Sequence, residues 1–187
     1  MPHEHEPISI AVDGPGSAGK GTIARGVAER LGYQYIDTGA MYRSVALQAT
    51  RVGLRWDDAA ALRDLVAALR FEFKWAEGIL RVFVNDDDVT SPIRDESIGL
   101  GASTVSKHVE VREALVALQR QLALKGGIVM DGRDIGTVVC PGAPHKLFVT
   151  ASIEVRAERR VKELQDRGLG AIYARVFEDM KERDARD

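Results

Sequence analysis

The segment Ile8–Thr22, ISIAVDGPGSAGKGT, decides the fold of this chain, because it joins a short apolar stretch to a glycine-rich turn that ends in Gly19-Lys20. Small residues let the backbone curl so that successive N–H groups face an anion, and the positive end of the following helix adds to that field. Lys20 can reach the outer phosphates of a nucleotide as a point charge. The segment therefore predicts a strand, a phosphate-binding loop and a helix, in that order.

One residue departs from the general loop pattern G-x-x-x-x-G-K-[ST]. Gly21 follows the lysine, and the hydroxyl comes one place later as Thr22. This GKGT form is found in many nucleoside monophosphate kinases, whereas GTPases and motor ATPases usually place the hydroxyl directly after the lysine. The loop thus favours a kinase over a GTPase or a motor.

The composition predicts one domain that binds small molecules. The chain has 187 residues, of which 45% are hydrophobic and 29% charged, enough for one buried core with insertions. A net charge of -2 argues against a nucleic-acid partner. No apolar run approaches bilayer-spanning length, and the first residues, MPHEHEP, do not resemble a signal peptide. We therefore expect a cytoplasmic protein with no membrane partner.

A cysteine, two histidines and an acidic stretch could each be functional, but we interpret each of them as structural or solvent-exposed. The one cysteine, Cys140, is expected to be a small packing residue after strand-like Val138-Val139 rather than a reactive thiol. His3 and His5 resemble a polar tail more than a metal site. The acidic stretch 85–88 lacks the ligand spacing of a calcium loop and is expected to be a solvated turn.

The remaining pattern alternates strands and helices. We expect strands at 34–37, 128–131 and 146–150, and helices at 22–31, 41–52, 57–69 (capped by Asp57), 96–106, 109–125, from Ser152 onward and at 171–186. Residues 71–75 and 80–84 alternate around a turn at 76–78, which predicts an inserted antiparallel hairpin. This order predicts an α/β protein with a mostly parallel sheet and helices on both faces.

Charged residues gather where such a sheet binds ligands, beyond the carboxyl ends of its strands. Asp131 ends an apolar strand. In phosphate-loop proteins, a carboxylate at the end of a neighbouring strand can hold magnesium, usually through water. Arg43 and Arg133 follow glycine-containing turns at predicted strand ends, where phosphoryl transfer needs positive charge. By contrast, Arg156, Arg175 and Arg186 are expected to be solvated surface charges.

The chain resembles the bacterial cytidylate kinases of the nucleoside monophosphate kinase family. The matching segments are DGPGSAGKGT, DTGAMYR, the EFKW to NDDDVTSPIR insert, ASTVSKHVEVREAL, MDGRDIGTVV, RAERR and ERDARD, in family order along nearly the whole chain. Adenylate kinases typically have DGFPR where this chain has DGRDIGT, and they lack the hairpin insert. The resemblance implies a three-layer P-loop fold divided into core (1–37), CMP-binding insertion (38–108), core (109–152), lid region (153–171) and a core helix (172–187).

The resemblance further implies transfer of the γ-phosphate of ATP to CMP or dCMP, with Mg²⁺, by a monomeric enzyme. Catalysis would use Lys20, Arg133, Arg159 and Arg183. ATP would bind Gly14, Pro15, Gly16, Ser17, Ala18, Gly19, Lys20, Gly21, Thr22, Arg159 and Arg160, and the metal would be held by Thr22 and Asp131. The acceptor nucleotide would bind Thr38, Arg43, Ser103, Arg112, Arg133, Asp134, Arg183 and Asp187, with Asp134, Arg112 and Ser103 at the cytosine edge.

The match has one departure, at the C-terminus. Family members continue into a final strand and helix with one more phosphate-binding arginine, whereas this chain stops at Asp187. The strand at 146–150 would then become an apolar sheet edge, which invites association. We expect a truncated polypeptide that binds nucleotides and turns over poorly. Two alternatives stay open: a catalytically weakened nucleotide-binding protein of the same fold, and a kinase for another acceptor such as UMP.

Overall fold

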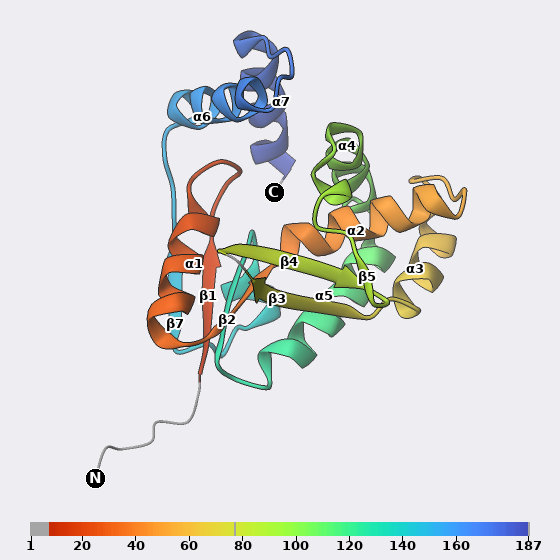
Figure 1. Cartoon of the computed structure of the whole chain (residues 1–187), viewed down its shortest axis with the longest axis vertical. Coiled ribbons are helices and arrows are strands. Elements are labelled where there is room, and N and C mark those ends of the chain that lie inside the picture. The colour runs from red at the N-terminus through yellow and green to blue at the C-terminus, as the bar shows by residue number, and fades with distance from the viewer. Residues whose placement is uncertain (1–7, 77, 187) are drawn as a thin grey trace.

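A four-stranded parallel sheet forms the centre of the computed structural model, which describes residues 8–76 and 78–186 (Figure 1). Its strands are β1 (Ser9–Asp13), β2 (Gln34–Asp37), β6 (Ile128–Gly132) and β7 (His145–Phe148), in the order β2-β6-β1-β7. Ala11 of β1 pairs with Met130 on one side and with Lys146 on the other. The α/β class expected from the sequence is confirmed. His3 and His5 lie outside the described residues.

Helices cover both faces of the inner strands. Residues Ile128 to Asp131 are all buried, and because successive strand side chains point to opposite faces, neither face is open to solvent. The helices packed against β6 are α1 (Lys20–Leu31), α2 (Thr38–Arg51) and α5 (Val109–Ala123).

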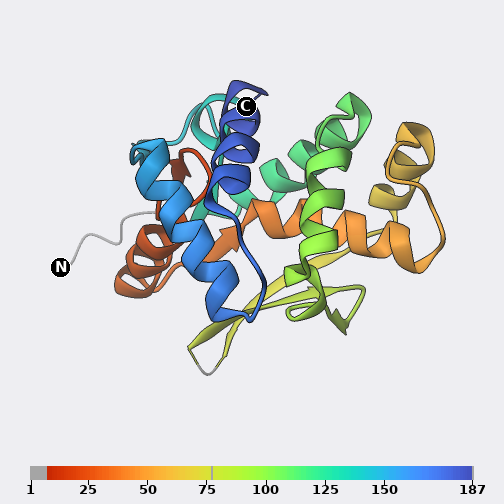
Figure 2. The same cartoon turned by 90° about the horizontal axis from the view of Figure 1, so that it is seen from above.

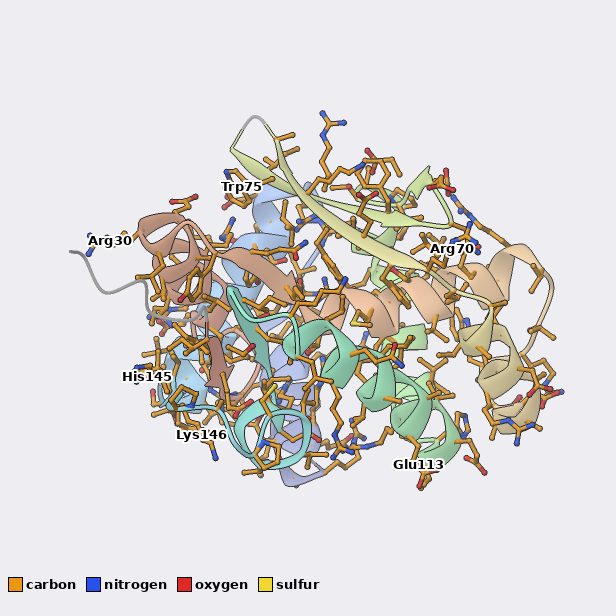
Figure 3. The ribbon with its side chains drawn as sticks, turned by 90° about the horizontal axis from the view of Figure 1, so that it is seen from below. Arg30, Arg70, Trp75, Glu113, His145 and Lys146 are labelled. Carbon is orange, nitrogen blue, oxygen red and sulfur yellow. The ribbon has the colours of Figure 1, made fainter. Side chains whose placement is uncertain are left out.

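Strand β7 forms an exposed edge of this sheet. It pairs with β1 alone, and Phe148 is 71% exposed. Figure 3 shows His145 and Lys146 at the periphery of the sheet. The expectation of an apolar edge here is therefore confirmed, although the strand begins and ends slightly earlier than the sequence predicts.

The predicted hairpin insert is present and gains a third strand. It comprises α3 (Ala59–Ala67), β3 (Phe71–Ala76), β4 (Ile79–Val84), β5 (Asp87–Asp88), the 3-10 turn η1 (Pro92–Arg94) and α4 (Glu96–Val105). Phe73 and Val82 face each other across the hairpin and are buried. The Gln34 amide of β2 donates to the Phe73 carbonyl at 2.9 Å. The Trp56 indole N–H donates to the Ala46 carbonyl at 3.1 Å.

The last two helices form a C-terminal limb, residues 153–186, beyond the end of the sheet at which β1 leads into α1 (Figures 1 and 2). Ser152 caps α6 (Ile153–Asp166) by accepting from the backbone N–H of Val155, as the sequence predicts. In α7 (Tyr173–Arg186), no residue is buried. Helix α7 packs on α6 with Val176, Phe177 and Met180 half-buried, and it adds no residue to the main hydrophobic core.

Two local predictions are wrong. Asp58, not Asp57, caps α3 by accepting from the Ala61 N–H at 3.0 Å, because Asp57 pairs with Arg55 instead. The segment Val138-Val139 is not strand-like. It belongs to η2 (Ile135–Val139), one turn of π-helix, because the apolar run is too short for its periodicity to distinguish strand from helix.

The acidic stretch at the end of the hairpin forms a turn, as expected. Asn85 and Asp86 have positive φ angles, and β5 follows at once. The carboxylates of Asp86, Asp87 and Asp88 pair with arginines. Among residues 8–76 and 78–186, no group of three or more His, Cys, Asp or Glu side chains is arranged to hold a metal ion. No helix in that part of the chain is long and apolar enough to cross a membrane.

Candidate active site

The phosphate loop connects β1 to α1 and has the curled backbone that the sequence predicts. Gly14 (φ +146°) and Gly19 (φ +103°) adopt conformations that favour glycine, and Ser17 also has a positive φ. A Cβ on Gly14 would lie 1.9 Å from the carbonyl oxygen of Val149, so only glycine fits. No side chain caps the first turn of α1, which leaves the helix dipole directed at the loop.

Lys20 lies at the centre of a cluster of charged side chains. Its ammonium donates to the Pro15 carbonyl at 2.9 Å, across the loop. Burial and the nearby Arg133 lower the pKa of Lys20, and Arg183 acts in the same direction, whereas Asp131 and Asp37 oppose the shift. The Lys20 ammonium of α1 is therefore in the electrostatic field of charged side chains from β2, β6, the β6–η2 connection and α7.

Asp131 brings negative charge to the same place. It is 7% exposed, and burial raises its pKa to about 7, with the charge of Asp37 contributing and Lys20 opposing. The Tyr35 hydroxyl donates to Asp131 Oδ1 at 3.2 Å. Asp37 caps α2 by accepting from the Ala40 N–H. Two carboxylates of neighbouring strand ends therefore face the lysine of the loop.

The donor set at this point fits a hydrated magnesium ion in part. Asp131 supplies a hard oxygen ligand, and a cation beside it would offset the effect of Asp37 that disfavours its charged form. The neighbouring Gly21 lies close, since a Cβ there would be 3.7 Å from Asp131 Oδ2. Thr22 is exposed on α1, so the fit is carried by Asp131.

A second carboxylate organises the segment after β6. Asp13 accepts from the backbone N–H groups of Ile135 and Gly136, both at 2.7 Å. This fixes the β6–η2 connection, which carries Arg133 and Asp134, against the end of β1. Arg133 lies against the phosphate loop, since a Cβ on Gly16 would be 3.2 Å from its Nη2.

Two of the predicted acceptor residues, Thr38 and Arg43, lie in the first turns of α2. Arg43 on α2 is close to the backbone of Gly39 and acts electrostatically on Asp131. The Thr38 hydroxyl is buried and donates to the carbonyl of Asp131 at 2.7 Å. Its hydrogen is thus already used within the protein, and its oxygen can still accept.

The predicted base-binding residues are partly brought together. Arg112 of α5 pairs with Asp134 at 2.8 Å, so the two expected cytosine ligands satisfy each other. Burial raises the pKa of the nearby Tyr42 to about 12; the charge of Arg112 opposes this shift and that of Asp134 adds to it. Ser103 lies half-buried on α4, and its carbonyl accepts from the Ser106 hydroxyl.

The arginines of α6 have different partners. Arg159 donates to the carbonyls of Ala18 at 3.1 Å and Ser17 at 3.4 Å, which places it over the phosphate loop as expected. Arg160 pairs instead with Glu96 of α4 at 2.8 Å and with Glu163 at 2.9 Å. The second lid arginine therefore faces the insert rather than the loop.

Arg156 is not the solvated surface charge that the sequence suggests. It is 4% exposed, donates to the Ala151 carbonyl at 3.0 Å and pairs with Asp184 through both of its terminal nitrogens. Arg175 and Arg186 are exposed, as predicted. Asp187 lies outside the described residues.

Cys140 behaves as a packing residue. It is half-buried after η2, and burial raises the pKa of its thiol, which disfavours the reactive thiolate. Two hollows, of about 490 Å³ beside Trp56 and about 250 Å³ beside Phe71, lie away from the charged cluster and contain no phosphate-loop residue.

Several members of the site were missed by sequence reasoning. Asp37 was detectable as a helix cap, because an Asp precedes the Thr38-Gly39 start of α2. Asp13, at the end of an apolar strand, had the same signal as Asp131. Tyr35, Tyr42 and Asp184 had none, since their roles depend on contacts between segments far apart in the chain.

Comparison with known proteins identifies the relatives of this chain. The family model described as cytidylate kinase matches residues 10–187. The cytidylate kinase of Streptococcus sanguinis is 50% identical over 181 residues, which cover 96% of this chain and 80% of that protein. Those of Symbiobacterium thermophilum and an Exiguobacterium species are 49% and 46% identical, with the same two coverages.

Proposed function

The chain belongs to the cytidylate kinase family, and from that premise we propose that its cluster of Lys20, Arg133 and Arg183 transfers the γ-phosphate of ATP to CMP or dCMP. The products are ADP and CDP or dCDP. The observation that carries the proposal is electrostatic. Both arginines lower the pKa of Lys20, so three cations from three segments surround one point at the phosphate loop. Phosphoryl transfer needs positioning and positive charge at the moving group.

The phosphate loop is proposed to hold the donor nucleotide. Residues 14–22 would bind the ATP phosphates through backbone N–H groups, and Arg159, whose guanidinium lies on the loop carbonyls, would turn toward the phosphates. Arg160 would join it from α6. Closure of this helix over ATP would exclude water and so suppress hydrolysis.

The acceptor nucleotide is proposed to lie between α2, α5 and the β6–η2 connection. Arg43 and Arg133 would bind the CMP phosphate, with Thr38 as a further contact, and Arg183 and Asp187 would complete the site. Arg112, Asp134 and Ser103 would bind the cytosine edge. A carboxylate can accept from the cytosine amino group, and a guanidinium can donate to its carbonyl and ring nitrogen. Opening the Arg112–Asp134 pair would supply both groups.

The reaction needs alignment more than proton removal. An oxygen of the CMP phosphate, already anionic at neutral pH, attacks the γ-phosphorus, and the bond between that phosphorus and the β–γ bridging oxygen breaks. Lys20, Arg133 and Arg183 neutralise the charge on the transferred group, and ADP leaves with the bridging oxygen. No residue is assigned as a general base.

Magnesium is proposed as the metal of this reaction, held by Asp131 and Thr22 through water. When bound, it neutralises the phosphates of ATP. The buried carboxylate of Asp131, beside Asp37, supports this assignment. We propose further that the protein acts as a cytoplasmic monomer on small nucleotides, which agrees with its net charge of -2.

An ADP-release assay with CMP, dCMP, UMP and AMP tests the proposed function. CMP or dCMP should be the best acceptor, and Asp134→Ala should abolish that preference. Glu113→Ala is the matched control, because this acidic side chain follows Arg112 on α5 and is exposed (Figure 3). Better turnover of UMP or AMP would assign another acceptor. ATP binding without ADP release for any of the four nucleotides would indicate a weakened nucleotide-binding protein.

A further inference from the structure

The buried guanidinium of Arg156 links three segments that are distant in sequence. Its Nη1 donates to the Gly16 carbonyl of the phosphate loop at 3.4 Å, and its Nε donates to Ala151 just before α6. Both terminal nitrogens pair with Asp184 on α7. Because its side chain is 5% exposed, this charge is stable only with a fixed partner.

Asp184 is the partner that determines how α7 is placed. No residue of α7 is fully buried, so its half-buried apolar residues, Val176, Phe177 and Met180, fix its rotation and its position along its axis only loosely. A two-pronged pair between a carboxylate and a guanidinium is directional, and it therefore defines both. Figures 1 and 2 show α7 running back toward the phosphate loop, where this pair lies.

Arg183 precedes Asp184 on the same helix. Adjacent helical residues point about 100° apart, so fixing the direction of Asp184 also fixes the direction of Arg183. Arg183 lies close enough to Lys20 to lower its pKa. The orientation of this cation at the phosphate loop thus depends on the carboxylate next to it.

We propose that Arg156 and Asp184 form a positioning pair that aims Arg183 at the transferred phosphate. Both residues would act through Arg183 rather than by touching the nucleotide. Through the Gly16 carbonyl, Arg156 also joins this pair to the loop that holds the donor. The inference rests on the proposed function, in which Arg183 stabilises the moving phosphoryl group.

A double-mutant cycle tests whether Asp184 acts through Arg183. We expect Asp184→Asn to lower kcat with CMP about 10- to 100-fold, the range for a misplaced catalytic group. In an Arg183→Ala background, the same change should cost less than about twofold, because the residue that it positions is gone. Asp179→Asn is the matched control, an exposed Asp-to-Asn change on the same helix.

Two results would overturn the proposal. One is an equal loss of kcat from Asp184→Asn in both backgrounds, and the other is a loss no larger than that of Asp179→Asn. If Asp184→Asn fails to fold, Arg156→Lys gives the same test, since lysine keeps the charge and loses the paired geometry. Its matched control is Arg175→Lys, and the same two criteria apply. Activity of the unmodified protein toward CMP tests the proposed function separately.

Discussion

The insert, taken here together with α2 as residues 38–108, and the C-terminal limb (residues 153–186) flank the same candidate active site, but different forces hold them. The insert contributes many residues to the hydrophobic core, among them Leu62, Phe73 and Val82. The limb contributes none to that core, and α7 has no buried residue at all. Its contacts with the rest of the chain include Arg156 to Gly16, Arg159 to Ala18 and Arg160 to Glu96.

Because of this difference, the insert should contribute most to the free energy of unfolding, and the limb should be the part that moves. Apolar packing is dense and costly to disturb, so the insert forms a fixed wall beside the proposed site of the acceptor nucleotide. The contacts of Arg159 and Arg160 lie at a partly exposed surface, where polar contacts are individually weak and exchange with water. These two contacts can therefore break at little cost in free energy of unfolding, whereas the contact of Arg156 is buried.

The largest expected effect comes from the packed side. Leu62 of α3 is fully buried, and Leu62→Ala should reduce the free energy of unfolding by about 2–5 kcal/mol through lost burial and a residual cavity. Chemical denaturation measures this value. Leu100→Ala is the control, because Leu100 is 64% exposed and should lose little. Equal losses for the two variants would contradict the assignment of the insert to the core.

The next effect has the opposite sign and tests Asp131, a buried charge at the end of β6 in the central sheet. The pKa of Asp131 is raised to about 7 from 3.8, so between these values the unfolded chain releases a proton that the folded chain keeps. Stability contributed by this group is therefore complete at low pH and is lost as pH rises toward 7. At pH 8 in EDTA, Asp131→Asn should raise the free energy of unfolding by about 1–3 kcal/mol.

Unfolding curves at several pH values measure this prediction. The difference between Asp131→Asn and the parent protein should shrink as pH falls from 8 to 5, because the parent carboxyl is then protonated in the folded state. A variant less stable than the parent at pH 8 would show that the Asp131 charge is favourable in the apo protein.

A smaller effect is expected at the contact between limb and insert. Glu96→Gln weakens the ion pair with Arg160. The Arg160 side chain is 27% exposed and the Glu96 side chain 44%, so the free energy of unfolding should change by less than about 1 kcal/mol. Amide hydrogen exchange should nevertheless become faster in α6 while staying constant in β1 and β6. Glu158→Gln on α6 serves as the control. No change in α6 would mean that this pair does not restrain the limb.

The smallest effect is that of salt. Raising NaCl from about 0.1 M to about 1 M shortens the Debye length from about 10 Å to about 3 Å and weakens exposed ion pairs. Exchange in the limb should rise by up to about twofold, and exchange in the sheet should not change. A uniform response of the whole chain would argue against two modes of attachment.

The parts that sequence predicts well are those with local patterns. The strand, loop and helix at 8–31 are signalled by an apolar run, glycines and Lys20, and the hairpin by alternating or apolar runs on either side of Gly78. These features depend on backbone geometry and on side-chain periodicity, both of which a single segment contains.

The features that could not be predicted from the sequence depend on contacts between residues that are far apart along the chain. In the sequence, Arg156 is one of several charges on a charged helix. In the fold, it is buried and pairs with Asp184 of α7, which follows it by 28 residues. The Arg160 side chain turns to Glu96 for the same reason, 64 residues away. The predicted positions of Lys20, Arg133 and Arg159 around the loop agree with the geometry, while their roles stay predictions.

The placement of the aromatic side chains has a spectroscopic consequence. The two tryptophans of the chain, Trp56 and Trp75, both belong to the insert, one hydrogen-bonded to Ala46 and the other on the hairpin (Figure 3). Intrinsic tryptophan fluorescence therefore reports residues 38–108 alone. A tryptophan placed at Phe177, whose ring centroid lies 6.0 Å from that of Tyr173 in α7, would add a separate optical signal for the C-terminal limb without a chemical label.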